Sequence, residues 1–213
     1  MTLRSWIDHV FGSCRRVRAS KRTLGTACIG IALVIVGGCR SGGSGPYQPQ
    51  AEVARSPLEA ERLTMKAAAL LEESPHKLDQ AEKLLREALT ADLYHGPAHN
   101  NLGVVFLKKG EFYAAASEFE WARKLLPGIP DPRVNLALTL ERAGRTSDAL
   151  KEYASALEVS PENLAAIQGI TSLQLRTGVT DDQTRPRLET IAMRSDSGAW
   201  RDWARMQLTR LDR

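Results

Sequence analysis

Residues 96–129 read GPAHNNLGVVFLKKGEFYAAASEFEWARKLLPGI, and residues 130–163 read PDPRVNLALTLERAGRTSDALKEYASALEVSPEN. Aligned without a gap, the two stretches match at seven packing and turn positions, each pair 34 residues apart. The positions are Gly103, Phe106, Gly110, Ala115, Phe119, Ala122 and Pro127, matched by Ala137, Leu140, Gly144, Ala149, Tyr153, Ala156 and Pro161. A repeat of this length indicates a solenoid, because each unit buries its apolar face only by stacking on its neighbours.

The spacing within one unit predicts two packed helices. Small residues such as Gly103 and Ala115 let the helices approach closely, and Phe119 fills the space between them. Gly110 is expected to end the first helix, because glycine adopts the left-handed conformation without steric penalty. Pro127 is expected to end the second helix and to start the turn into the next unit.

These two units resemble the tetratricopeptide repeat, a family of stacked helical hairpins. The resemblance implies an all-α, right-handed solenoid, here of three to four hairpins, with repeats at 96–129 and 130–163. Stepping back 34 residues predicts a divergent repeat over 57–95. Its turn is expected to be remodelled around Ser74 and Pro75, since His76 and Leu93 replace the glycine and the proline.

Stepping forward predicts a degenerate repeat over 164–196. Polar residues stand at the packing positions of its second helix, namely Gln183, Arg187 and Thr190. Pro186 is expected to interrupt that helix and leave a shifted one over about 187–194. Residues 197–213 place apolar side chains near helical spacing and predict a capping helix.

The first 38 residues are typical of a signal peptide. Basic residues, ending with Arg22, precede a charge-free stretch over 23–38 whose apolar part, 29–36, is short for a membrane span of about 20 residues. The stretch ends in Val36-Gly37-Gly38-Cys39, which resembles the bacterial lipobox. This resemblance implies cleavage before Cys39 and a lipid on its thiol. An uncleaved membrane anchor and a soluble start are the alternatives.

The resemblance implies a membrane lipoprotein of the bacterial cell envelope. Cleavage would leave Cys39 as the only cysteine, because the other two are Cys14 and Cys28. Arg40 follows it, where an aspartate commonly retains Gram-negative lipoproteins at the inner membrane, so the outer membrane facing the periplasm is expected. The pair Arg15 and Arg16 lacks the apolar residues of a twin-arginine signal, which favours general secretion.

The net charge of the chain changes sign once the predicted signal peptide is removed. The chain has 29 basic and 25 acidic residues, of which six basic and one acidic precede residue 39. The remainder therefore holds 23 basic and 24 acidic residues. Nucleic acid is not an expected partner. Residues 39–56, rich in Gly, Ser, Pro and Gln, predict a flexible linker with a reach of roughly 20 to 25 Å.

The sequence offers no constellation typical of an enzyme, and we expect no catalytic residues, metal or cofactor. His95 and His99 are four apart, but a helix start separates them, so His99 is expected to pack at the start of its helix and His95 to lie in the turn. Asp181 and Asp182 are adjacent, which suits a helix cap or a solvated turn better than a catalytic pair. Phosphate loops and nucleophile elbows are missing.

The family resemblance implies a concave groove, lined by the first helix of each repeat, that binds a peptide or a partner helix. Asn101 and Asn135 are equivalent by the 34-residue step, and side-chain amides both donate and accept hydrogen bonds. Val104 and Leu138 form a second, apolar row. The predicted groove residues are Asn100, Asn101, Val104, Lys108, Asn135, Leu138 and Arg142. Alternatively, the asparagines only cap and solvate the groove, and the apolar row packs between repeats.

Some arrays of this family clamp a C-terminal carboxylate with Lys, Asn and Arg side chains. Lys66 and Asn101 fit part of that pattern, but Asp131 and Asn135 stand where cations are expected. The groove is therefore expected to take an internal peptide segment or a neighbouring helix. The predicted function is a protein-binding scaffold, with pilus, secretion or envelope assembly as settings. A self-associating envelope protein and an adaptor for a cell-wall hydrolase are the alternatives.

Overall fold

The computed structural model describes residues 55–73 and 77–212, and this part of the chain forms nine α-helices. The predicted signal peptide, Cys39, all of the linker except its last two residues, and the turn at Ser74 and Pro75 lie outside the described residues. The helices are α2 (Pro57–Glu73), α3 (Leu78–Ala91), α4 (Gly96–Lys109), α5 (Phe112–Leu125), α6 (Asp131–Arg142), α7 (Thr146–Val159), α8 (Leu164–Thr177), α9 (Thr184–Arg194) and α10 (Gly198–Leu211).

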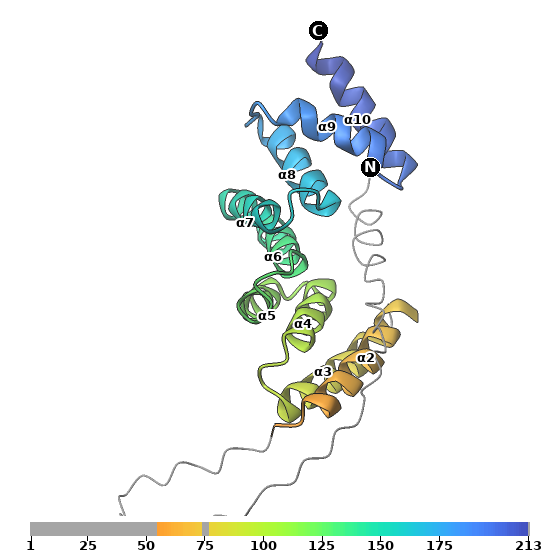
Figure 1. Ribbon diagram of the computed structural model, residues 1–213, viewed down its shortest axis with the longest axis vertical. Helices are drawn as coiled ribbons and strands as arrows, with labels where there is room; N and C mark the ends of the chain where they lie inside the picture. The colour runs from red at the N-terminus through yellow and green to blue at the C-terminus, as the bar shows by residue number, and fades with distance from the viewer. Residues whose placement is uncertain (1–54, 74–76, 213) are drawn as a thin grey trace, which may run out of the picture.

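Consecutive helices pack in pairs, and the first helix of each pair also contacts the first helix of the next. Figure 1 shows α4, α6 and α8 along one side of the row and α5 and α7 along the other. The row bends, with α2 and α3 at one end and α9 and α10 at the other, both leaning toward the side of the first helices. This all-α array of paired helices confirms the predicted fold class.

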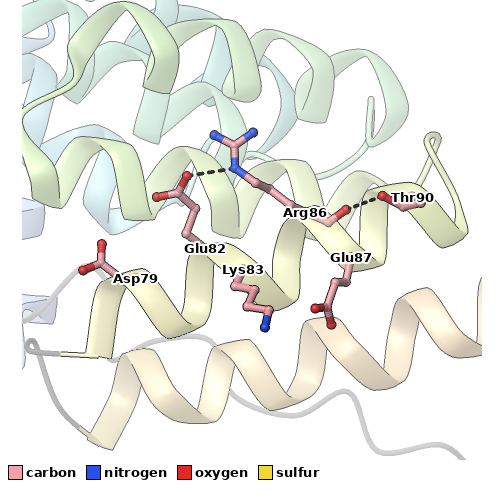
Figure 2. A pocket seen from close by; sticks show the side chains of 6 residues that line it. All are labelled: Asp79, Glu82, Lys83, Arg86, Glu87 and Thr90. Atoms are coloured by element: carbon pink, nitrogen blue, oxygen red, sulfur yellow. Dashed lines mark hydrogen bonds and ion pairs between the residues drawn. The ribbon is translucent and has the colours of Figure 1, made fainter.

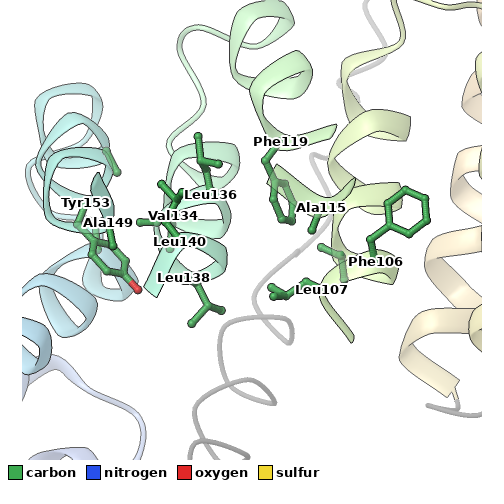
Figure 3. Close-up of a cluster of buried hydrophobic side chains, with 14 of the residues drawn as sticks. Phe106, Leu107, Ala115, Phe119, Val134, Leu136, Leu138, Leu140, Ala149 and Tyr153 are labelled. Atoms are coloured by element: carbon green, nitrogen blue, oxygen red, sulfur yellow. The ribbon is translucent and has the colours of Figure 1, made fainter. Parts of the chain in front are cut away.

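The packing inside the two regular hairpins follows the predicted positions. Ala115 and Phe119 on α5 are fully buried, as are Ala149 and Tyr153 on α7 (Figure 3). A Cβ added to Gly103 would lie only 2.7 Å from a ring carbon of Phe119, so this position requires the smallest side chain.

Glycines follow the first helices of the last three hairpins, also as predicted. Gly110 caps α4 with φ 82°, and Gly178 caps α8 with φ 72°. Gly144, just after α6, has φ 78°. Residues with a Cβ rarely adopt this left-handed conformation, which explains glycine at the same place in three units.

The second helix of the degenerate repeat differs from the prediction. It begins at Thr184 instead of about residue 187, and Pro186 lies inside its first turn. Proline is tolerated there, because the first N–H groups of a helix have no partner within the helix. The expectation that Pro186 interrupts the helix was therefore wrong.

The packing positions of α9 are also shifted by one residue. Its buried residues are Thr184, Leu188 and Ile191, each one place later than the position that a strict 34-residue step selects. The turn after Gly178 holds the additional residue. α9 packs on α8 and also on α10, whose Trp200 and Ala204 are buried. The helix predicted near the C-terminus is thus present.

Candidate functional site

We call the side of α2, α4, α6 and α8 that faces away from α5 and α7 the inner face; it lies on the inside of the bend in Figure 1. Every predicted groove residue belongs to α4 or α6. The two helices contact each other, so the inner face crosses the joint between the two regular repeats without interruption.

The structure brings the three predicted asparagines together. The Nδ2 amide of Asn135 on α6 donates to Oδ1 of Asn100 on α4, at 3.1 Å. The amide of Asn100 in turn lies 3.4 Å from Oδ1 of Asn101. Asn135 is only 4% exposed, whereas Asn100 and Asn101 are half-buried. The result is a chain of amides that links two repeats, with Asn100 and Asn101 as its accessible end.

The predicted apolar row is buried in this structure. Val104 is 6% exposed and Leu138 2%, and both belong to the hydrophobic core cluster. Figure 3 shows Leu138 and Leu107 pointing to the same side of the row of helices, while Leu136 points to the opposite side of α6. The alternative that the row packs within the array accounts for this burial. Contact of these side chains with a partner stays a prediction.

Cations follow the inner face at the ends of α4, α6 and α8, namely Lys108, Arg142 and Arg176. Arg142 lies four residues after Leu138, hence on the same helical face. Its Nε is buried without a hydrogen-bond partner among the described residues. Burial lowers the pKa of this guanidinium, although the nearby Glu141 and Tyr153 act in the opposite direction.

Sequence reasoning missed a third member of this row. Lys108 and Arg142 were predicted, and one further step of 34 residues reaches Arg176 at the end of α8. Arg176 donates to Oε1 of Glu141 at 2.9 Å, and the hydroxyl of Tyr153 donates to Oε2 of the same carboxylate at 3.2 Å. Glu141 thereby fastens α7 and α8 to α6. The repeat itself was the signal that would have identified Arg176.

A second polar surface lies on α3. Figure 2 shows its six lining side chains, Asp79, Glu82, Lys83, Arg86, Glu87 and Thr90. Arg86 donates to Glu82 at 2.8 Å, and Lys109 of α4 contacts both Asp79 and Glu82, which raises the pKa of the lysine. These groups bind one another across α3 and α4, so the surface is explained by the packing of the first two hairpins.

The paired residues considered for chemistry have structural roles. His95 precedes α4 in the turn and His99 is buried near its start, as predicted. Asp181 accepts the backbone N–H of Gln183 at 3.0 Å and pairs with Arg187 at 3.0 Å, so it organises the start of α9.

Within the described ranges, no group of His, Cys, Asp and Glu side chains is arranged to hold a metal ion. The helices between residues 55 and 212 include none with the length and apolar character of a membrane span.

No protein-family model matches the chain. Two curated proteins with tetratricopeptide repeats are similar in sequence. "TPR repeat-containing thioredoxin TTL4" of Arabidopsis thaliana is 34% identical over 83 residues, or 39% of this chain and 12% of that protein. "Tetratricopeptide repeat protein 28" of Mus musculus is 26% identical over 98 residues, or 46% of this chain and 4% of that protein. The chain thus matches small parts of much longer proteins, and in the thioredoxin the match covers only the repeat region.

Solved structures of tetratricopeptide repeats have the same arrangement of helices. The first repeat domain of Spaghetti (RPAP3), bound to the HSP90 peptide SRMEEVD, is similar with a TM-score of 0.55 at 18% identity, covering 59% of this chain and 98% of that one. MamA is similar with a TM-score of 0.56 at 21% identity, covering 63% and 80%.

The Yersinia enterocolitica type III secretion translocator chaperone SycD is similar with a TM-score of 0.52 at 19% identity, covering 57% of this chain and 96% of that one. At these identities the likeness concerns the fold. Together with the 34-residue spacing, it shows that the described helices have the tetratricopeptide repeat fold.

Proposed function

We propose that this chain is a non-catalytic scaffold whose inner face holds a peptide segment or a helix of a partner protein. The observation that carries the proposal is the amide chain from Asn135 through Asn100 to Asn101, which joins two repeats on that face. A side-chain amide can pair with both the N–H and the C=O of a peptide backbone. Its partner would be recognised in part through main-chain hydrogen bonds.

The cations along the same face favour a partner segment that carries acceptors. Lys108, Arg142 and Arg176 stand in the last turns of α4, α6 and α8, and a carboxylate or carbonyl of the partner would accept hydrogen bonds from such side chains. The RPAP3 repeat domains are similar in fold and were solved with HSP90 and HSP70 peptides. Asp131, the exposed first residue of α6, stands where the carboxylate clamp of the family has a cation. Its acidic side chain suits the N-terminal end of a helix. An internal segment therefore fits this face better than a C-terminal carboxylate.

A lipid on Cys39 would tether this scaffold to a membrane of the bacterial envelope, with the outer membrane favoured. The support is the lipobox-like sequence that ends at Cys39, followed by a linker rich in Gly, Ser, Pro and Gln. Such a linker would let the repeats stand away from the bilayer and reach partners in pilus, secretion or envelope assembly.

Site-specific photocrosslinking tests the binding face. A photoreactive amino acid is placed at Asn101 or Arg176 on the inner face, and at Tyr113, which is 90% exposed on α5, as the matched control. The full chain is expressed in a bacterium, irradiated, and its adducts are identified by mass spectrometry. We expect the same partner polypeptide from both inner positions and none from Tyr113. Adducts from Tyr113 alone would contradict the proposed face.

The tether has its own test, which is independent of the binding face. The full chain and a Cys39→Ser variant are expressed, membranes are separated, and the mass of the N-terminal peptide is measured. We expect a diacylated or triacylated Cys39 in the membrane fraction, and loss of processing in the variant. An unmodified chain that starts at Met1 would refute the tether and leave the binding face untouched.

A further inference from the structure

The ring of His99 lies between two hydrogen-bond acceptors from different elements. Its Nδ1 is 2.6 Å from Oε2 of Glu118 on α5, and its Nε2 is 2.9 Å from the carbonyl oxygen of Leu93 in the α3–α4 turn. The ring also stacks on Trp121 of α5, with centroids 5.8 Å apart and planes at 16°. His99 is 5% exposed, so water cannot easily replace either partner.

This geometry determines where the protons are. A backbone carbonyl only accepts hydrogen bonds, so Nε2 must carry a hydrogen. The Glu118 carboxylate also accepts, which requires a hydrogen on Nδ1. A proton shared between a carboxylate and an imidazole favours the imidazole, because the usual pKa values are about 4.3 and about 6.5. Only the imidazolium donates from both nitrogens, so His99 is positively charged in this arrangement.

The charged groups around the ring leave Glu118 as its counter-ion. Asp92 in the α3–α4 turn is paired with Arg55 at 2.8 Å. Lys124 on α5 lies over the Trp121 ring, 5.6 Å from its centroid.

His95, in the same α3–α4 turn, and Glu61 of α2 face each other at 3.3 Å. Burial lowers the pKa of His99, but the hydrogen bonds to Glu118 and to the Leu93 carbonyl outweigh it, so that pKa lies above its ordinary value.

We propose that His99 is a proton-controlled latch, whose doubly protonated ring ties the α3–α4 turn to α5 and so fixes the first hairpin on the second. Removing one proton turns a ring nitrogen into an acceptor that faces another acceptor. Either the Leu93 carbonyl or the Glu118 carboxylate then loses its donor. The joint between the two hairpins is expected to loosen when this happens.

The direction of the pH effect follows from the raised pKa in the folded state. The stabilisation by the latch is complete below the pKa of an unfolded histidine, about 6.5. It is lost as the pH rises through the higher pKa of the folded state. The joint should therefore be firmest in mild acid and loosen as the pH rises through the folded pKa of His99.

Nitrogen-15 NMR of the His99 ring in the full chain tests the latch. We expect both ring nitrogens to be protonated at pH 6.5, a titration midpoint above that of an ordinary histidine, and a shift of the Tyr94 amide with the same midpoint. Tyr94 is a suitable reporter because it follows Leu93 in the turn. A single protonated nitrogen at pH 6.5, or a Tyr94 signal that does not follow the ring, would overturn the proposal.

Two variants separate the latch from a general effect of charge. Glu118→Gln removes the anionic acceptor and should lower the midpoint of His99. Glu120→Gln changes an exposed carboxyl on the same helix and should leave the midpoint unchanged. An equal midpoint in both variants would exclude Glu118 as the acceptor. The wild-type titration decides the question if Glu118→Gln does not fold.

Discussion

The hairpin of α6 and α7 and the hairpin of α8 and α9 begin alike and then differ. In both, the first helix is followed by a glycine in the left-handed conformation, Gly144 or Gly178. The buried face of the second helix then starts five residues later at Ala149, but six residues later at Thr184. From there the spacing is the same, because Leu188 and Ile191 follow Thr184 as Tyr153 and Ala156 follow Ala149. The repeat therefore tolerates an insertion in the turn, but the spacing of buried positions within the helix is kept.

The turn with the extra residue has its own support. Asp181 accepts from the Gln174 amide of α8 at 2.9 Å and from Arg187 of α9 at 3.0 Å. Both helices thus donate hydrogen bonds to one carboxylate, and these bonds support a turn that is one residue longer than the regular one.

The largest expected effect tests the shifted positions of α9. Leu188→Ala should cost about 2 to 5 kcal/mol of unfolding free energy, because Leu188 is fully buried and its loss leaves a cavity. Arg187→Ala, at the position that a strict 34-residue step selects, should cost about 1 kcal/mol or less. Urea unfolding of both variants measures the difference. Equal costs would reject the shifted positions.

The next effect tests the close approach of α7 and α8. A Cβ on Gly169 would lie 2.3 Å from the ring of Tyr153, so Gly169→Ala should overpack the joint by about 2 to 3 kcal/mol. Gly103→Ala should cost less, since its Cβ would lie 2.7 Å from Phe119. Gly128→Ala is the control, because nothing lies within 4 Å of its Cβ. Thermal melts measure the difference. Equal melting temperatures for Gly169→Ala and Gly128→Ala would contradict the packing.

A smaller effect tests the feature that the two hairpins share, the left-handed glycine after the first helix. Gly144→Ala and Gly178→Ala should each cost about 1 kcal/mol, because alanine is strained at a positive φ. The two costs should agree, since neither position has a neighbour within 4 Å of an added Cβ. Chemical denaturation of the two variants checks this. A cost for Gly178→Ala near zero would show that the end of α8 is not built like that of α6.

The smallest effect concerns the turn with the extra residue. Burial raises the pKa of Asp181, but the bonds from Gln174 and Arg187 outweigh this and the pKa lies below its ordinary value. Its stabilisation should be present above the pKa of an unfolded aspartate and be lost as the pH falls through the lower folded value. Asp181→Asn should lower stability at pH 7 by less than about 1 kcal/mol and leave it unchanged near pH 2. Melting temperatures across that pH range measure it, and an undiminished difference near pH 2 would contradict the role of the carboxylate.

Much of the fold could be predicted because residues 34 positions apart have side chains of similar size. Gly103, Ala115 and Phe119 identify a hairpin by themselves, since few other residues fit at those distances. The start of α9 could not be predicted by the same step, because the added residue lies in a turn without apolar pattern. The spacing of Thr184, Leu188 and Ile191 contained the signal, one residue out of phase.

The sequence predicted which types of residue form the candidate site, but not which of them bind one another. The repeat placed Asn101 and Asn135 at equivalent positions, yet Asn135 on α6 donates its hydrogen bond to Asn100, the residue before its equivalent on α4. Asn135 is also buried, so Asn135→Ala would weaken the array as well as any binding. Asn101→Ala is the cleaner probe of recognition, since Asn101 is half-buried at the end of the amide chain.

The affinity of the photocrosslinked partner for the Asn101→Ala variant tests the central claim most directly. Binding of that partner is measured by calorimetry to the wild-type protein, to Asn101→Ala and to Glu120→Ala, an exposed change on α5. The account predicts an affinity loss of about 5-fold or more for Asn101→Ala, the size of one hydrogen bond, with an unchanged melting temperature and no loss for Glu120→Ala. Equal affinity of all three proteins would contradict recognition at the inner face.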